Sequence, residues 1–112
     1  MTYENALAAL ADPTRRAIYE SLRGQARAVG EIASGFPVSR PAVSQHLRVL
    51  REAGLVSESR QGVRRLYVAS PAAALALRDY FQSMWECAMR SYARHVTTEE
   101  KRHARKPRSR RR

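Results

Sequence analysis

One segment near the middle of the chain limits the possible folds more than any other, because it has the pattern of a single amphipathic helix. Val43, Leu47 and Leu50 recur at the spacing of one helix face. Ser39 stands where a helix needs an N-cap, and Gly54 stands where a helix commonly ends. The other positions are mostly polar, so we expect the apolar face to pack on a core and the opposite face to meet solvent.

The flanking segments add a second helix and a β-hairpin. A short helix is predicted over residues 29–34, and the Gly-Phe-Pro sequence at 35–37 cannot continue it. After the central helix, residues 55–60 and 65–69 have the pattern of two short strands, joined by a turn at 61–64. Helix, turn, helix and hairpin in this order predict a winged helix-turn-helix.

Three further helices are predicted, over residues 3–10, 13–22 and 71–94. The second and third of these begin at a proline that follows a capping residue, Asp12 or Ser70. The predicted fold class is therefore mainly α, with about five helices and a small two-stranded β-hairpin as the wing.

The positive charge of the chain is concentrated near its C-terminal end. The formal net charge is +11, and residues 101–112 hold eight of the 21 basic side chains and no acidic one. We predict a domain of residues 1–95 with one core, followed by a basic, disordered tail of residues 96–112. The tail either adds salt-sensitive affinity for nucleic acid, which we favour, or is a solvated end with little effect.

The polar face of the central helix carries side chains suited to reading DNA. In helix-turn-helix proteins the N-terminal part of the second helix meets the bases of the major groove. Arg40 can bind guanine through two hydrogen bonds, and Gln45 can bind adenine in the same way. Arginines further along this helix and in the hairpin would contact phosphate or the minor groove. The predicted DNA-binding residues are Ser39, Arg40, Pro41, Ser44, Gln45, Arg48, Arg51, Arg60, Arg64 and Arg65.

The predicted last helix is apolar over a stripe too wide for one surface helix on a small domain. We expect part of this stripe to pack against a second subunit, together with the first helix. Its aromatic residues could instead line a ligand pocket between subunits, which we consider the weaker interpretation. The predicted dimer-interface residues are Leu7, Leu10, Leu77, Phe81, Met84, Trp85, Ala88 and Tyr92.

Several classes of protein are disfavoured by what the sequence lacks. It has no run of about eighteen uncharged apolar residues, so no membrane span is expected, and residues 1–10 do not resemble a secretory signal. A single cysteine, Cys87, cannot form an internal disulfide and fits the reducing cytoplasm. An enzyme is not expected, because no glycine-rich phosphate loop and no nucleophile with a nearby base is evident.

Two functions remain, and they belong to different classes. The first is a sequence-specific regulator that binds double-stranded DNA as a homodimer, most simply a repressor at an inverted-repeat operator. The alternative is a non-specific, nucleoid-like nucleic-acid-binding protein driven by the basic tail. A module for protein contacts is disfavoured, because Arg40, Gln45 and Arg48 occupy positions where such a surface would have apolar residues.

The chain resembles the ArsR/SmtB family of bacterial repressors. The resemblance rests on ADPTRRAI at residues 11–18, VSRPAVSQHLRVLREAGLV at 38–56 and GVRRLY at 62–67. It covers about residues 5–93, and the order and spacing of the three motifs are more specific than any one of them. It implies a winged-helix dimer that represses promoters by blocking polymerase and that dimerises through the first and last helices.

The resemblance also implies two places where family members hold a metal ion, and this chain departs from both. The paired cysteines of the third helix are replaced by Ala33 and Gly35. The ligand positions of the last helix align with Asp79, Phe81, Tyr92 and His95. Two ligands from each subunit do not readily complete the four-coordinate site that zinc prefers. We therefore predict no metal and no cofactor, and an inducer ligand is left open.

Four single residues allow two interpretations each. His46 could contact DNA, but we favour a packing residue whose ring bonds a nearby carbonyl. Cys87 could be a redox switch, but a small buried hydrophobe is more common. Arg15 and Arg16 could contact phosphate or pair with Glu20, and the sequence favours neither.

Overall fold

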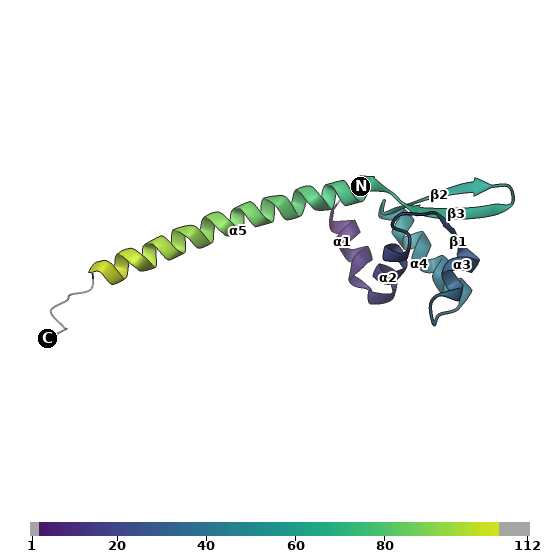
Figure 1. The fold of residues 1–112 in the computed structure, drawn as a ribbon, viewed down its shortest axis with the longest axis horizontal. Coiled ribbons are helices and arrows are strands. Elements are labelled where there is room, and N and C mark those ends of the chain that lie inside the picture. The colour runs from purple at the N-terminus through teal and green to yellow at the C-terminus, as the bar shows by residue number, and fades with distance from the viewer. Residues whose placement is uncertain (1–2, 106–112) are drawn as a thin grey trace. The chain divides into compact units, whose positions relative to one another are not determined.

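The computed structural model describes residues 3–105 (Figure 1). This part of the chain divides into two units, one ending at Asp79 and one beginning at Tyr80. The elements are α1 (Tyr3–Ala11), α2 (Pro13–Ser21), β1 (Arg27–Ala28), α3 (Val29–Ser34), α4 (Arg40–Glu52), β2 (Val56–Gln61), β3 (Arg64–Ala69) and α5 (Pro71–Arg105). The predicted class, mainly α with five helices and a β wing, is confirmed.

The helix α2 begins where the sequence predicts. The Asp12 carboxylate accepts a hydrogen bond of 2.8 Å from the backbone N–H of Arg15, and Pro13 follows in the first turn. That hydrogen bond is the main reason why the pKa of the Asp12 carboxyl lies below its usual value. The cap therefore favours the charged carboxylate.

Two arginines of α2 close the end of α1. Arg15 Nε donates to the carbonyl oxygen of Ala9 at 2.6 Å, and Arg16 Nη1 donates to that of Leu10 at 2.8 Å. These carbonyls lie in the last turn of α1, where no helical N–H is available to them. Neither arginine forms an ion pair with Glu20 among residues 3–105, whereas the alternative of a contact with phosphate stays a prediction. In the free chain the two side chains fix the corner between α1 and α2.

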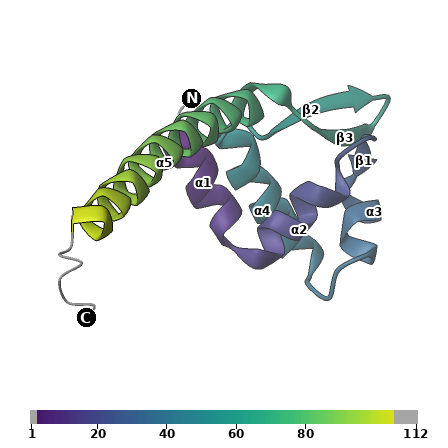
Figure 2. The ribbon, with the colours of Figure 1, turned by 60° about the vertical axis from the view of Figure 1, so that its left-hand side comes forward.

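The core of the first unit is formed by side chains from α1, α2, α3, α4, the sheet and the first turns of α5. Figure 2 shows how the helices α1 to α4 are arranged. The predicted stripe of α4 is confirmed, because Val43, Leu47 and Leu50 are fully buried. The helix α3 contributes Ile32, which is also buried. Within residues 3–105, the buried residues of this core are Ala6, Ala9, Ile18, Leu22, Ile32, Val43, Leu47, Leu50, Ala53, Leu55, Val56, Tyr67 and Ala73.

The wing contains one strand more than the predicted hairpin. The sheet has the order β1-β3-β2 and all its pairs are antiparallel. The added strand β1 pairs Arg27 with Tyr67 and Ala28 with Leu66, which ties β3 to the segment leading into α3. The predicted hairpin of β2 and β3 is confirmed, and only β1 was not predicted, because a two-residue strand has no periodic pattern and forms only beside an available strand edge.

The β2–β3 turn follows the prediction. Gln61 pairs with Arg64, which leaves a two-residue loop of Gly62 and Val63. Gly62 has a φ of 67°, whereas no residue other than glycine has a positive φ in the described chain. A positive φ at the first loop position only is the pattern of a type II′ hairpin turn, which requires glycine there.

The helix α5 is longer than predicted. It runs from Pro71 to Arg105, whereas the sequence predicted an end near Arg94 and disorder from about Thr97. An ion pair of 3.4 Å between Glu99 and Arg102, one turn apart, accompanies the added turns. The tail predicted for residues 96–112 is therefore helical as far as it is described. Residues 106–112 lie outside the described residues, and the division at residue 95 remains a prediction.

The first turns of α5 belong to the first unit. Ala73 is buried, and Leu77 is partly buried against the core. Leu10 of α1 is likewise partly buried there, and Leu7 is half-buried. These three leucines were predicted for a dimer interface, and two of them already contact the core of their own chain.

The second unit is the helical segment from Tyr80 onward, and its apolar side chains are exposed. Trp85 and Tyr92 are 62% and 66% exposed, and Phe81, Met84 and Met89 are exposed to a similar extent. Cys87 is exposed as well, so the prediction of a buried cysteine is wrong for the single chain. No helix of the described residues is long and apolar enough to cross a membrane.

Candidate nucleic-acid interface

The N-terminal half of α4 is positioned by its cap and by its buried stripe. The Ser39 hydroxyl accepts a hydrogen bond of 3.2 Å from the backbone N–H of Ala42, and Pro41 lies in the first turn. With the buried side chains on one face, the opposite face is set toward solvent. The predicted residues Ser39, Arg40, Pro41, Ser44, Gln45, Arg48 and Arg51 are all exposed.

The exposed face of α4 has an internal polar contact. Arg48 Nη2 donates to Gln45 Oε1 at 3.4 Å. This contact is long and exposed, so it is readily exchanged for a contact with a ligand. Gln45 keeps its amide N–H groups available, and these are the donors that an adenine N7 requires.

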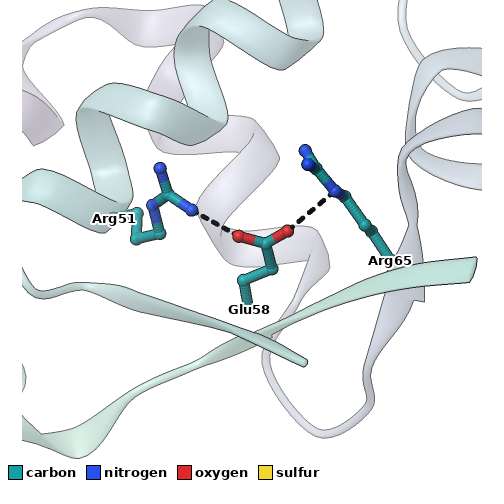
Figure 3. Close-up of polar contacts among 3 residues, drawn as sticks. All are labelled: Arg51, Glu58 and Arg65. Atoms are coloured by element: carbon teal, nitrogen blue, oxygen red, sulfur yellow. Dashed lines mark hydrogen bonds and ion pairs between the residues drawn. The ribbon is translucent and has the colours of Figure 1, made fainter. Parts of the chain in front are cut away.

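The C-terminal end of α4 is linked to the wing through Glu58 of β2. Its carboxylate forms ion pairs with Arg51 of α4 and with Arg65 of β3 (Figure 3). The Arg65 contact measures 3.1 Å from Nε to Oε2, and the Glu58 side chain is only 17% exposed. The structure therefore uses two predicted DNA-binding arginines to join three elements.

A groove of about 550 Å³ lies between the start of α3, the start of α4 and the wing. Arginines from α4 and from both wing strands line it, and we call it the arginine groove. The Arg40 guanidinium packs beside Gly30. If Gly30 had a side chain, its Cβ would lie 3.8 Å from Cζ of Arg40, which is ordinary van der Waals contact. The lining residues are Ala28, Val29, Gly30, Glu31, Arg40, Ser44, Arg60, Val63, Arg64 and Arg65.

One carboxylate, that of Glu31, lies in the wall of the arginine groove. Its Oε1 accepts a hydrogen bond of 2.8 Å from the backbone N–H of Ala28 and lies 3.3 Å from Arg64 Nη2. Neither Glu31 nor Glu58 was predicted to have a role at this surface. A glutamate at the third position of a helix is a known signal for the first contact, whereas the ion pairs depend on the tertiary fold.

His46 is half-buried on α4, in agreement with a packing role. Its Nδ1 is buried and has no hydrogen-bond partner among residues 3–105, so the predicted bond to a carbonyl is not found at that atom. The charge of His46 contributes in a minor way to the lowered pKa of Asp12. His46 is therefore partly enclosed by the protein, whereas the neighbouring Gln45 is exposed.

Metal ligands do not gather in the part of the chain that the structure describes. No group of three or more His, Cys, Asp or Glu side chains is placed to hold a metal ion there. In α3 and its C-cap, Ala33 and Gly35 have no side chain that could bind one.

Comparisons with known proteins agree with this geometry. The sequence matches the family described as "Helix-turn-helix domain" over residues 10–58. It is 48% identical over 96 residues to the HTH-type transcriptional regulator Rv2034 of Mycobacterium tuberculosis, covering 86% of this chain and 90% of that protein. It is 46% identical over 61 residues to the HTH-type transcriptional repressor SmtB of the same species, covering 54% of this chain and 45% of that protein.

A solved structure agrees over most of the chain. The ArsR-like transcriptional regulator from Rhodococcus sp. RHA1 superposes with a TM-score of 0.76 at 27% sequence identity, covering 86% of this chain and 91% of that one. Rv2034 and this Rhodococcus protein are both named transcriptional regulators. The chain is accordingly a DNA-binding transcriptional regulator, and it belongs to the ArsR/SmtB family of winged helix-turn-helix regulators.

Proposed function

We propose that this regulator is a cytoplasmic repressor that binds an inverted-repeat operator as a homodimer. The observation that carries the proposal is the exposed face at the start of α4, where Arg40 and Ser44 line one groove with the arginines of the wing. Gln45 follows Ser44 in the helix and is exposed as well. The relative SmtB is named a repressor. Repression follows when a protein occupies the DNA that polymerase needs.

We assign base recognition to residues in the first turns of α4. Arg40 and Gln45 have donors that match guanine and adenine, and neither side chain is held by a carboxylate of the described residues. Arg48, further along the helix, is placed for phosphate, and Arg60 and Arg64 extend the positive surface into the wing. Arg51 and Arg65 serve mainly to orient the wing, because both bind Glu58.

Dimerisation is supported by the exposed apolar side chains of the second unit. Phe81, Met84, Trp85 and Tyr92 are each at least 45% exposed along one helix. Large exposed apolar surfaces are uncommon on monomeric proteins and mark contacts with other proteins. Because α4 occurs once per chain, a two-fold dimer would present two copies to the two halves of an inverted repeat.

The first experiment compares binding to the upstream promoter DNA of the gene with binding to scrambled DNA of equal length. We expect the wild type to prefer the promoter by about a thousandfold or more. The Arg40→Ala/Gln45→Ala variant should lose that preference while it retains most non-specific affinity. Arg23→Ala/Gln25→Ala is the matched control, since it removes the same groups from an exposed loop before α3.

The alternative function is non-specific binding of nucleic acid, and the eight basic residues at 101–112 favour it. A chain that ends at Glu100 separates the two functions. If it keeps the promoter preference, the α4 surface provides the specificity. Equal binding of both DNAs by the wild type, abolished in the shortened chain, would mean that the basic end is the binding element and that the repressor proposal is wrong.

A further inference from the structure

The arginine groove has more positive charge than its carboxylates neutralise. Arg40 and Arg60 have no acidic partner within residues 3–105, whereas Arg64 pairs with Glu31 and Arg65 with Glu58. Guanidinium groups gathered at a hollow are suited to phosphate, because each can donate two parallel hydrogen bonds to its oxygens. The groove is therefore chemically matched to a phosphate group.

The two carboxylates beside these arginines differ in how firmly they hold them. Glu58 is 17% exposed and binds two arginines at once. Glu31 is 55% exposed and binds one arginine, which is itself 52% exposed. Exposed ion pairs of this kind are weak and are screened by salt. Arg64 is thus the groove arginine with a partner that it can exchange at low cost.

Glu31 is nevertheless fixed at the groove wall. The hydrogen bond from the backbone N–H of Ala28 holds the same oxygen that faces Arg64. A carboxylate in this position presents oxygen atoms to a guanidinium much as a phosphate would. The free protein therefore already contains an anion at the place where Arg64 would meet its ligand.

We propose that the arginine groove binds one phosphate of the DNA backbone and that Glu31 competes with this phosphate for Arg64. In the free protein, Arg64 is paired with Glu31. In the complex, Arg64 pairs with the phosphate and Arg60 adds positive charge to the same groove, whereas Arg40 is the residue proposed to read a base. The carboxylate lowers the affinity for every DNA, since a backbone phosphate is the same in all sequences. This inference rests on the proposed function, in which this surface binds DNA.

A double-mutant cycle on scrambled and promoter DNA tests the proposal, using wild type, Glu31→Gln, Arg64→Gln and the double variant. Glutamine can still accept the hydrogen bond from Ala28, so the start of α3 is preserved. We expect Glu31→Gln to raise affinity about threefold to tenfold at low salt, and Arg64→Gln to reduce the slope of log affinity against log salt by about 0.9. In the Arg64→Gln background, the gain from Glu31→Gln should fall below about twofold.

Glu52→Gln is the matched control, because it makes the same charge change at an exposed position of α4 that does not line the arginine groove. An equal gain from Glu52→Gln, or a Glu31→Gln gain that persists without Arg64, would overturn the proposal. The scrambled DNA keeps this result independent of operator recognition. If the wild type lacks a promoter preference, the repressor proposal fails, and the cycle still reports on the groove.

A free phosphorylated compound is the other source of the same chemistry. Replacing chloride by inorganic phosphate at constant ionic strength distinguishes it from DNA. We expect this exchange to leave DNA affinity nearly unchanged, since a lone ion has none of the neighbouring contacts of the duplex. If phosphate weakens DNA binding by the wild type, while Arg64→Gln leaves DNA affinity and salt slope unaltered, the groove does not hold a backbone phosphate.

Discussion

The Glu58 carboxylate of β2 lies 3.1 Å from Nε of Arg65 on β3, and its other oxygen binds Arg51 of α4. This glutamate therefore connects the wing to the helix that we expect to enter the major groove. Arg51 and Arg65 are both among the residues that the sequence predicts to bind DNA. Their partner in the structure gives them a second role, which is to fix the angle at which the wing leaves the domain.

We predict that Glu58→Gln lowers both stability and specificity. The free energy of unfolding should fall by about 1 kcal/mol, the upper end for a partly exposed ion pair, because two arginines lose one shared partner. Non-specific DNA binding should rise with the added positive charge, while the preference for promoter DNA should fall. Urea unfolding and fluorescence anisotropy measure the two effects. The control is Glu52→Gln. If it changes the free energy of unfolding, the non-specific affinity and the promoter preference as much as Glu58→Gln does, only net charge matters and the orienting role of Glu58 is wrong.

Asp12 makes stability depend on pH in the acid range. Its folded-state pKa lies below the ordinary value of about 3.9, so its stabilising effect is complete above that value and is lost as the pH falls through the lowered pKa. Asparagine can also cap a helix but does not titrate there. We expect wild type to unfold at a higher temperature than Asp12→Asn at pH 6, with the difference shrinking below pH about 4.

Thermal unfolding of both proteins from pH 6 downward checks this expectation. The other carboxylates are the same in both proteins, so their contributions to the unfolding temperature cancel in the comparison. A difference that stays constant with pH would show that the Asp12 charge does not contribute.

Gly62 is required by the backbone of the wing turn. Its φ of 67° is strained for a residue with a side chain, although a Cβ there would meet no atom within 4 Å. Gly62→Ala should therefore destabilise the fold by about 1 kcal/mol, and Gly62→Asn by less, since asparagine tolerates a positive φ. Val63→Ala, at a position that is 95% exposed, is the control and should be nearly neutral. Equal effects of the three substitutions in urea unfolding would contradict this explanation.

Trp85 is the expected centre of the dimer contact. It is the largest side chain on the exposed apolar part of α5, and buried tryptophans commonly dominate the energy of an interface. Trp85→Glu should weaken dimerisation by a hundredfold or more, roughly the loss of one interface hot spot. Sedimentation velocity over a concentration series measures this. Ser83→Glu, an exposed site two residues away, controls for added charge. Unchanged sedimentation of Trp85→Glu would remove this helix from the interface.

The sequence allowed most of the first unit to be predicted because its signals are local. A capping residue followed by proline marks the starts of α2 and α5, and Ser39 marks the start of α4. The stripe of Val43, Leu47 and Leu50 defines the buried face of α4. These signals depend only on neighbouring residues and on helix geometry. The wing was likewise predicted from the local strand pattern of residues 55–60 and 65–69, and the resemblance to a family with the same order of motifs agreed with it.

The remaining features depend on contacts between segments. The strand β1 exists because β3 has a free edge beside it, and Glu58 joins two arginines that come together only when the hairpin pairs in register. Polar composition near residue 97 suggested disorder, whereas helix-compatible spacing of Glu99 and Arg102 continues α5. At the DNA-binding surface, the exposure of the predicted α4 residues follows from the helical periodicity. The positions of Glu31 and Glu58 beside the arginines cannot be read from that periodicity, because they depend on the tertiary fold.

The separation of the two faces of α4 bears on how this regulator can change over evolution. The side chains that hold the helix in place, Val43, Leu47 and Leu50, are fully buried, and the residues proposed to read bases are exposed. Exposed substitutions away from special contacts usually alter stability little. A gene duplicate could therefore acquire a new target sequence through one or two changes on the outer face, without passing through poorly folded intermediates.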